Sequence, residues 1–340
     1  MIYQLRNILI AVGIMIMLIS GCKKSTTNIE TGNDDDRIPR SAYVINNLGQ
    51  NLSVIKLDSN AVTADALPTG QIPNQILLRD TKAYVVNSGT NDLQVIDLEA
   101  LSTIQTIDLG SGTNPYNMDF LNDSLAVVSL LLTNEVAIVN LNTAQVEDNI
   151  SVGSSPEGVL CYQQKIYVAN SGFNGSGYDP GKLSVIDVSN PNSFSVDSIS
   201  TGLNPQHLAM DSQQKVIVAC SGNFSNVSGQ IDIVDASVDS VIQSIPVNIP
   251  ITTVAVNTLD KAYLGTFGSG IVVYNLQQGT FERGANNLLP AGGPGIAFDA
   301  QNNAYFTDFA ADSVHIYSEQ HQHLQSYLVG DGPLSIAIYE

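Results

Sequence analysis

The chain is poor in residues that carry acid–base, nucleophilic or metal chemistry, and those present form no known catalytic pattern. Its 340 residues include four histidines and three cysteines. The sequence contains no Gly-x-Ser-x-Gly, His-Glu-x-x-His or Cys-x-x-Cys segment; these mark α/β-hydrolases, zinc proteases and dithiol sites. We therefore predict a protein that is not an enzyme, with no catalytic residue and no cofactor.

Two of the histidines, His321 and His323, stand two positions apart. On a β-strand they would share one face and could hold a metal ion. No third ligand is evident from the sequence, so a solvated turn without a metal is the favoured interpretation. Metal binding is the alternative.

The other candidate residues depend on a repeat that must position them. Prolines in polar turns recur about every 40 to 50 residues, at Pro73, Pro115, Pro156, Pro205, Pro250, Pro294 and Pro333. Two apolar runs keep this spacing, and their clearest copies are Ala83-Tyr-Val-Val-Asn87 and Leu93-Gln-Val-Ile-Asp97. Each run occurs seven times and is bounded by Gly, Asn or Asp, which indicates buried β-strands.

Seven repeats of this length predict an all-β fold, a seven-bladed β-propeller with four-stranded blades. Each repeat has a proline turn, strand a, strand b (the Tyr-Val run), strand c (the Val-Ile-Asp run) and strand d. The folded chain begins inside a strand b at Ser41 and ends in Leu334–Tyr339, which has the pattern of strand a. We expect the ring to be closed by three N-terminal strands plus one C-terminal strand, because this leaves no open sheet edge.

These runs resemble the YVTN-type β-propeller repeat from residue 41 to residue 340. Ala126 stands where the repeat usually has Tyr, and Asn248 stands where it usually has the turn glycine. The resemblance extends to surface lipoprotein propellers of Gram-negative bacteria, which are called YncE-like or surface-layer-like. One such group captures cobalamin and passes it to an outer-membrane transporter, so the resemblance implies capture of a small nutrient.

The N-terminal segment predicts a lipid anchor. Residues 8–19 form an apolar run of signal-peptide length after Arg6. The following Ile19-Ser-Gly-Cys22 is similar to a bacterial lipobox. That resemblance implies a signal peptide over residues 1–21 and acylation of Cys22; an ordinary secretory signal is the alternative. Residues 22–40 are polar and would form a flexible tether to the propeller domain at residues 41–340.

The net charge is −19 at pH 7. An acidic chain repels phosphate backbones and anionic lipid, so we expect no nucleic-acid partner and membrane attachment through the lipid anchor only. The predicted location is the outer membrane.

His207 follows Pro205 by two residues, at the entrance to a strand a, where a propeller side chain rims the central channel. Gln75 and Asn117 stand at the corresponding position of two neighbouring repeats, and Tyr116 and Glu157 stand one position earlier in theirs. These polar residues are included as candidate ligand contacts. Such residues form one lobe of a ligand site in this interpretation. Solvated rim residues without a ligand are the alternative.

Two b–c loops are longer than the others. The loop at residues 172–181 contains Phe173 and Tyr178, and the loop at residues 222–229 contains Phe224. The two blades are adjacent, and b–c loops should share a face with the proline turns. Long loops on one face of a repeat protein often form its binding face, and aromatic side chains among Gly, Ser and Asn suit such contacts. Neutral variation of loop length is the alternative.

We predict from these features a non-enzymatic lipoprotein that binds a ligand on this face. The partner is a small molecule, of the cobalamin type by resemblance, for delivery to a TonB-dependent transporter. Two alternatives stay open: a scaffold that binds another envelope protein, and a propeller enzyme of the lactonase or quinoprotein-like kind.

Overall fold

The computed structural model describes residues 38–190 and 193–340, and Ile38–Glu340 form one compact unit. The predicted signal peptide, Cys22 and nearly all of the tether lie outside the described residues. Within the described part, no helix is long and apolar enough to cross a membrane.

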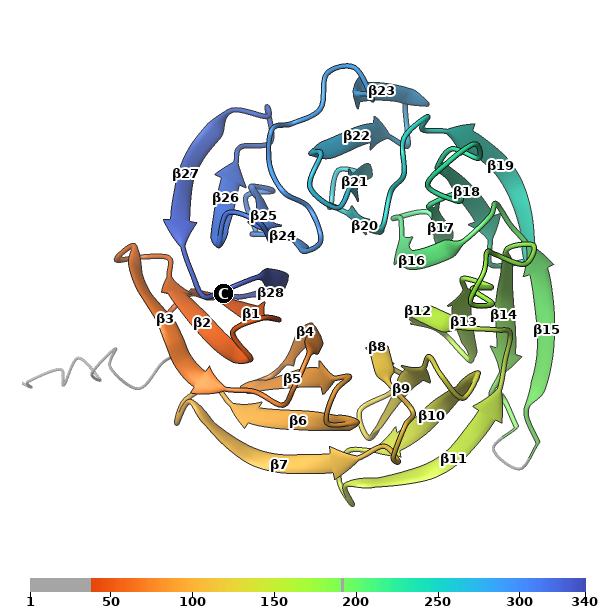
Figure 1. Cartoon of the computed structure of the whole chain (residues 1–340), viewed down its shortest axis with the longest axis horizontal. Helices are drawn as coiled ribbons and strands as arrows, with labels where there is room; N and C mark the ends of the chain where they lie inside the picture. Colours follow the sequence, from red (N-terminus) through yellow and green to blue (C-terminus); the bar gives the residue numbers. More distant parts are fainter. Residues whose placement is uncertain (1–37, 191–192) are drawn as a thin grey trace, which may run out of the picture. The chain divides into compact units, whose positions relative to one another are not determined.

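The described residues form seven antiparallel sheets of four strands each, arranged as blades around a central axis (Figure 1). This confirms the predicted all-β, seven-bladed propeller. From the axis outwards, strands a to d of blade 1 are β28 (Pro333–Tyr339), β1 (Ser41–Asn46), β2 (Asn51–Lys56) and β3 (Ala61–Pro68). In blade 2 they are β4 (Pro73–Arg79), β5 (Lys82–Asn87), β6 (Asp92–Asp97) and β7 (Ser102–Asp108).

Blades 3 to 5 follow in chain order. Blade 3 contains β8 (Pro115–Phe120), β9 (Leu125–Leu130), β10 (Glu135–Asn140) and β11 (Gln145–Ser151). Blade 4 contains β12 (Pro156–Tyr162), β13 (Lys165–Asn170), β14 (Lys182–Asp187) and β15 (Ser195–Ser200). Blade 5 contains β16 (Pro205–Met210), β17 (Lys215–Cys220), β18 (Gln230–Asp235) and β19 (Ser240–Pro246).

Two blades with shorter strands complete the ring. Blade 6 contains β20 (Thr253–Val256), β21 (Lys261–Gly265), β22 (Ile271–Asn275) and β23 (Thr280–Arg283). Blade 7 contains β24 (Ile296–Phe298), β25 (Ala304–Asp308), β26 (Ser313–Tyr317) and β27 (His323–Leu328).

The apolar core lies in the seams between neighbouring blades. Strands b and c are buried along most of their length, because the preceding blade covers one face of each sheet and the following blade covers the other. The strand-b residue that corresponds to Tyr84 of blade 2 packs, in every blade, into the seam with the following blade. That residue is Tyr in five blades; in blade 3 it is Val127 and in blade 5 it is Ile217. The alignment that placed Ala126 at this position was wrong by one residue.

The last strand closes the ring as predicted. β28 pairs with β1 in an antiparallel register that runs from Ser41 opposite Tyr339 to Asn46 opposite Pro333. Arg40, expected in the tether, reinforces this closure, since its guanidinium lies 2.5 Å from Glu340 Oε1 and 3.2 Å from Asp58 Oδ1.

The b–c loops and the proline-bearing d–a loops share one face of the ring, as the antiparallel strands require. Backbone hydrogen bonds join the two kinds of loop within a blade: Gly89 N donates to Gln71 O at 2.8 Å, and Gly172 N donates to Ser154 O at 3.1 Å. We call this surface the front face. The a–b and c–d loops form the opposite, back face.

The back face includes His321, for which the predicted solvated environment is wrong. Its side chain is only 7% exposed in the seam between blades 6 and 7. Nε2 lies 3.4 Å from the Tyr263 hydroxyl and 3.5 Å from Glu282 Oε2. His321 therefore belongs to the packing of that seam.

Candidate ligand-binding face

The two faces of the ring differ in charge. The front-face loops contain just three charged residues, Asp179, Asp312 and Asp331. The back-face loops contain Asp58, Asp80, Glu99, Asp123, Asp211, Asp239, Asp260, Asp299 and Glu319. Depletion of charged residues is a mark of the centre of a binding surface, so the front face is the better candidate.

Exposed apolar side chains also concentrate on the front face. Seven large apolar residues of its loops are between 41 and 65% exposed: Leu48, Ile72, Leu132, Phe173, Phe224, Val227 and Phe267. The back-face loops contribute Val238 and Leu259, among the described residues. A surface patch with many exposed apolar groups marks an interaction site.

A cavity of about 210 Å³ opens at the centre of the front face. It is lined by strand-a residues and loops from every blade except blade 4: Asn74, Gln75, Tyr116, Asn117, Gln206, His207, Thr252, Thr253, Phe267, Pro294, Leu334 and Ser335. Four predicted site residues therefore meet here, namely Gln75, Tyr116, Asn117 and His207. None of the twelve side chains carries a carboxylate, ammonium or guanidinium group.

Two polar atoms of this cavity have no partner within the described protein. His207 Nδ1 and Thr252 Oγ1 are buried and make no hydrogen bond. Burial lowers the pKa of His207 to about 4, so its imidazole is neutral at pH 7. Unpaired buried polar atoms cost free energy, and a hydrogen-bonding group placed in the cavity would remove that cost.

Other cavity side chains are fixed by their own hydrogen bonds. Gln75 Oε1 accepts from the backbone N of Met118 at 2.6 Å, and Gln75 Nε2 lies 3.3 Å from Asn117 Oδ1. Burial raises the pKa of Tyr116, which keeps its hydroxyl protonated as a donor. The cavity therefore presents amide, hydroxyl and imidazole groups, all neutral at pH 7.

The blade 4 insertion folds into a small hairpin at the rim. Phe173 and Tyr178 pair across it, with ring centroids 5.6 Å apart. Asn174 Oδ1 closes its turn by accepting from the backbone N of Gly177 at 3.0 Å, and Ser155 Oγ ties the Phe173 carbonyl to the d–a loop at 3.0 Å. The loop thus holds a half-exposed Phe173 and a partly buried Tyr178 in a defined place.

The blade 5 insertion presents Phe224 next to it in the ring. Phe224 is about half exposed and has a positive φ of 55°. Asn223 Oδ1 holds the loop by accepting from the backbone N of Val227 at 2.8 Å. In this conformation the Phe224 ring lies on the surface of the loop and is available to contact a ligand.

Glu157 differs from the other predicted site residues, because it does not line the central cavity. Its side chain is buried beside Ser171, and Gly158 next to it packs against the backbone of Gln206 and His207. Burial raises the pKa of Glu157 to about 8, an effect that the neighbouring Ser171 hydroxyl partly offsets.

Sequence reasoning missed the contribution of blades 6 and 7. Phe267, at the tip of a short b–c loop, lines the central cavity and packs against Phe309 in a tilted arrangement with ring centroids 5.3 Å apart. The sequence feature that could have identified Phe267 is an aromatic residue at the tip of a b–c loop. The prediction had considered only the loops with insertions.

Comparison with known proteins supports the fold alone. No family model matches the chain, and no curated protein matches its sequence. Among solved structures, a functionally unknown protein from Desulfotomaculum acetoxidans is similar with a TM-score of 0.70 and 14% identity, over 88% of this chain and 98% of that one.

Two further structures are similar at the same level. A protein from Lactobacillus plantarum has a TM-score of 0.69 and 12% identity, over 88% of this chain and 100% of that one. A quinoprotein alcohol dehydrogenase-like protein from Bacteroides thetaiotaomicron has a TM-score of 0.63 and 14% identity, over 88% of this chain and 78% of that one. These likenesses support the propeller fold and carry no information on activity.

Proposed function

We propose that this protein is a lipid-anchored outer-membrane propeller that binds a small nutrient on its front face and does not transform it. The observation that carries the proposal is the combination of a charge-poor, apolar rim and a central cavity lined by neutral hydrogen-bonding groups. A large neutral ligand with an apolar surface and peripheral amide or hydroxyl groups matches both parts.

A corrinoid has this chemistry, and the resemblance to cobalamin-capturing lipoproteins makes it the first ligand to test. The same features support binding over catalysis. In the cavity His207 is neutral at pH 7, and no carboxylate stands beside it to form an acid–base pair.

The binding test uses cyanocobalamin and isothermal titration calorimetry. Changing Phe173 and Tyr178 together to Ala should weaken binding by about tenfold or more, because buried aromatic contacts dominate binding energy. The melting temperature should stay nearly unchanged, since both side chains belong to a surface loop. The matched control, Val238→Ala with Leu259→Ala, removes exposed apolar groups from the back face and should leave binding intact.

An envelope protein is the second candidate partner. The seven exposed apolar side chains of the front-face loops favour it. If cyanocobalamin does not bind at all, crosslinking from Phe173 and Phe224 positions in cells tests this alternative. A single crosslinked envelope protein, lost in the Phe173 and Tyr178 double variant, would replace the nutrient hypothesis.

The anchor is tested separately at Cys22. Because acylation of this residue is the only predicted attachment to the membrane, Cys22→Ser should release the protein into the soluble fraction. Cell fractionation measures this. If the variant stays fully with the outer membrane, another surface holds it there.

A further inference from the structure

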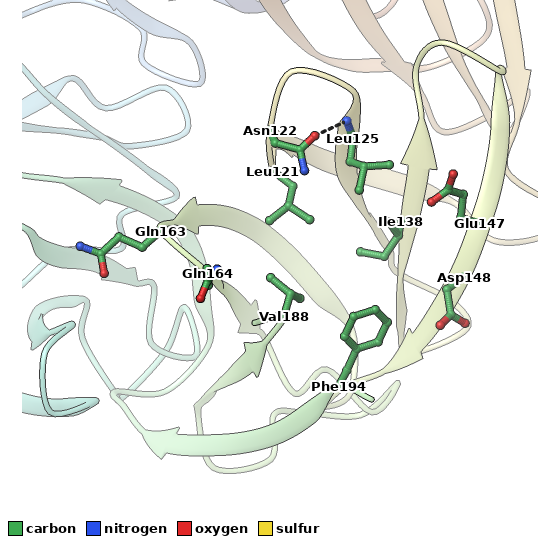
Figure 2. A pocket seen from close by; sticks show the side chains of 10 residues that line it. All are labelled: Leu121, Asn122, Leu125, Ile138, Glu147, Asp148, Gln163, Gln164, Val188 and Phe194. Atoms are coloured by element: carbon green, nitrogen blue, oxygen red, sulfur yellow. Dashed lines mark hydrogen bonds between the residues drawn. The ribbon is translucent and has the colours of Figure 1, made fainter. Parts of the chain in front are cut away.

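A larger cavity of about 590 Å³ lies on the back face, in the seam between blades 3 and 4 (Figure 2). Five apolar side chains surround it, Leu121, Leu125, Ile138, Val188 and Phe194. Glu147 and Asp148 stand at one side, and Asn122, Gln163 and Gln164 complete the rim. The volume is in the range of small-molecule sites, which combine an apolar lining with a few polar groups.

The sequence explains why this seam is open. In five seams a strand-b tyrosine packs against the next blade, whereas Val127 occupies that position here. The first residue of strand b is Lys in blades 2, 4, 5 and 6, but it is Leu125 in blade 3. Strand b of blade 3 therefore contributes neither an aromatic ring nor an ammonium group to the seam with blade 4.

The seam between blades 6 and 7 shows what fills this space elsewhere. Glu282 occupies a bulge of β23, and its Oε1 accepts from Asn275 Nδ2 at 3.0 Å. Its Oε2 lies 3.1 Å from Lys261 Nζ, and the Tyr263 ring is buried beside them. A carboxylate, an ammonium and an aromatic ring thus form one packed group.

Blade 3 has the carboxylate of this group but neither the lysine ammonium nor the strand-b tyrosine. Glu147 occupies the matching bulge of β11, and its Oε1 accepts from Asn140 Nδ2 at 2.6 Å. Among the described residues, neither Glu147 nor Asp148 forms an ion pair, because Leu125 replaces the lysine. The space beside Glu147 is the cavity itself.

We propose that this cavity binds an organic ammonium ion with an aromatic or branched apolar body. The ammonium group pairs with Glu147, as Lys261 pairs with Glu282, and the body fills the hollow between Leu125, Ile138 and Phe194, as Tyr263 fills the other seam. Asp148 adds a second negative charge at the rim. This site is separate from the front face and goes beyond the function proposed above.

The test compares 4-phenylbutylammonium with the neutral 4-phenylbutan-1-ol by calorimetry on the purified protein. The ammonium compound should bind about tenfold more tightly than the alcohol, a modest factor because the carboxylate is exposed to solvent. Glu147→Gln should remove this preference. Leu125→Lys supplies the missing ammonium from within the chain and should abolish binding, while the melting temperature reports that the fold is kept.

Glu99→Gln is the matched control, because it removes an exposed carboxylate from a back-face loop of blade 2. It should leave binding unchanged, and so should the Phe173 and Tyr178 double variant of the front face. Raising the salt concentration should weaken the binding of the ammonium compound and leave the binding of the alcohol unchanged. Equal affinity for the two compounds, full binding by folded Glu147→Gln protein, or no binding at millimolar concentration would each overturn the proposal.

Discussion

Glu157 is the residue whose ionisation should have the largest effect on stability. The residue is only 8% exposed, and its carboxyl has no cationic partner in an ion pair among the described residues. Burial raises its pKa from the ordinary value of 4.5 to about 8. The folded protein therefore keeps the proton that the unfolded chain has already lost between these two pH values.

The raised pKa of Glu157 predicts how the stability of the protein depends on pH. Between about pH 5 and pH 8 the free energy of unfolding should fall as pH rises, by up to about 1.4 kcal/mol per pH unit. Glu157→Gln should remove this slope and be more stable than wild type at pH 8. His207, whose pKa is lowered, contributes the opposite slope below pH 6.5, so the Glu157 effect is measured as the difference between wild type and Glu157→Gln in urea unfolding. Parallel profiles for the two proteins would contradict it.

At the scale of single residues, position in the repeat predicted part of the candidate site. Gln75, Tyr116, Asn117 and His207 follow a proline by one or two residues, and strand geometry directs them into one cavity. Glu157 has the same spacing but does not line the cavity, because the packing between blades 4 and 5 decides where its side chain goes. That packing depends on contacts far apart in the sequence, which the repeat pattern does not contain.

At the scale of the elements, the glycine of the proline turn is explained by a close approach to strand b. A Cβ at Gly153 would lie 2.6 Å from Asn170 Cγ, and the Asn170 side chain is held by a hydrogen bond to Ser184 Oγ at 3.0 Å. The asparagine of strand b therefore needs a glycine opposite it. This contact accounts for two of the repeated residues together.

Gly153→Ala should accordingly destabilise the fold by about 1–3 kcal/mol, since a buried, hydrogen-bonded neighbour must move. Gly177→Ala is the matched control, because a Cβ there meets no atom within 4 Å and φ is not positive. Urea unfolding of both variants measures the difference. Equal stability of the two proteins would show that the turn accommodates the methyl group.

The order and number of strands could be predicted from the sequence, whereas their register could not be predicted everywhere. The two sets of seven apolar runs correctly predicted a strand b and a strand c in every blade. In blade 3 the usual tyrosine is absent, and the alignment then slipped by one residue and placed Ala126 where Val127 lies. A slip of one residue reverses the face of a strand, and for this reason the open seam beside Val127 was not foreseen.

At the scale of the whole molecule, the ring separates two surfaces with different chemistry. The front-face loops are nearly free of charge, whereas the back-face loops hold many of the carboxylates that make the chain acidic. This separation could be predicted in outline, because the strand order assigns every loop to a face. The cavities could not be predicted, because they depend on how side chains from several blades fill shared space.

The closure of the ring is the property on which both cavities depend. β28 packs against β1 in its own blade and beside β4 of blade 2 and β24 of blade 7, so it holds the first and last blades together. A chain ending at Gly330 lacks this strand and exposes the inner edge of β1, together with the seams that Ile336 helps to fill. Unpaired edges promote association between molecules.

We expect that chain to lose its cooperative thermal transition and to form aggregates, measured by calorimetry and size-exclusion chromatography. Arg40→Ala provides the control at the same junction. It removes the exposed ion pairs with Asp58 and Glu340 but leaves β28 in place, so it should cost about 1 kcal/mol or less and keep a cooperative transition. A monomeric chain ending at Gly330 with the melting temperature of the wild type would mean that the strand supplied by the C-terminus is not what holds the ring together.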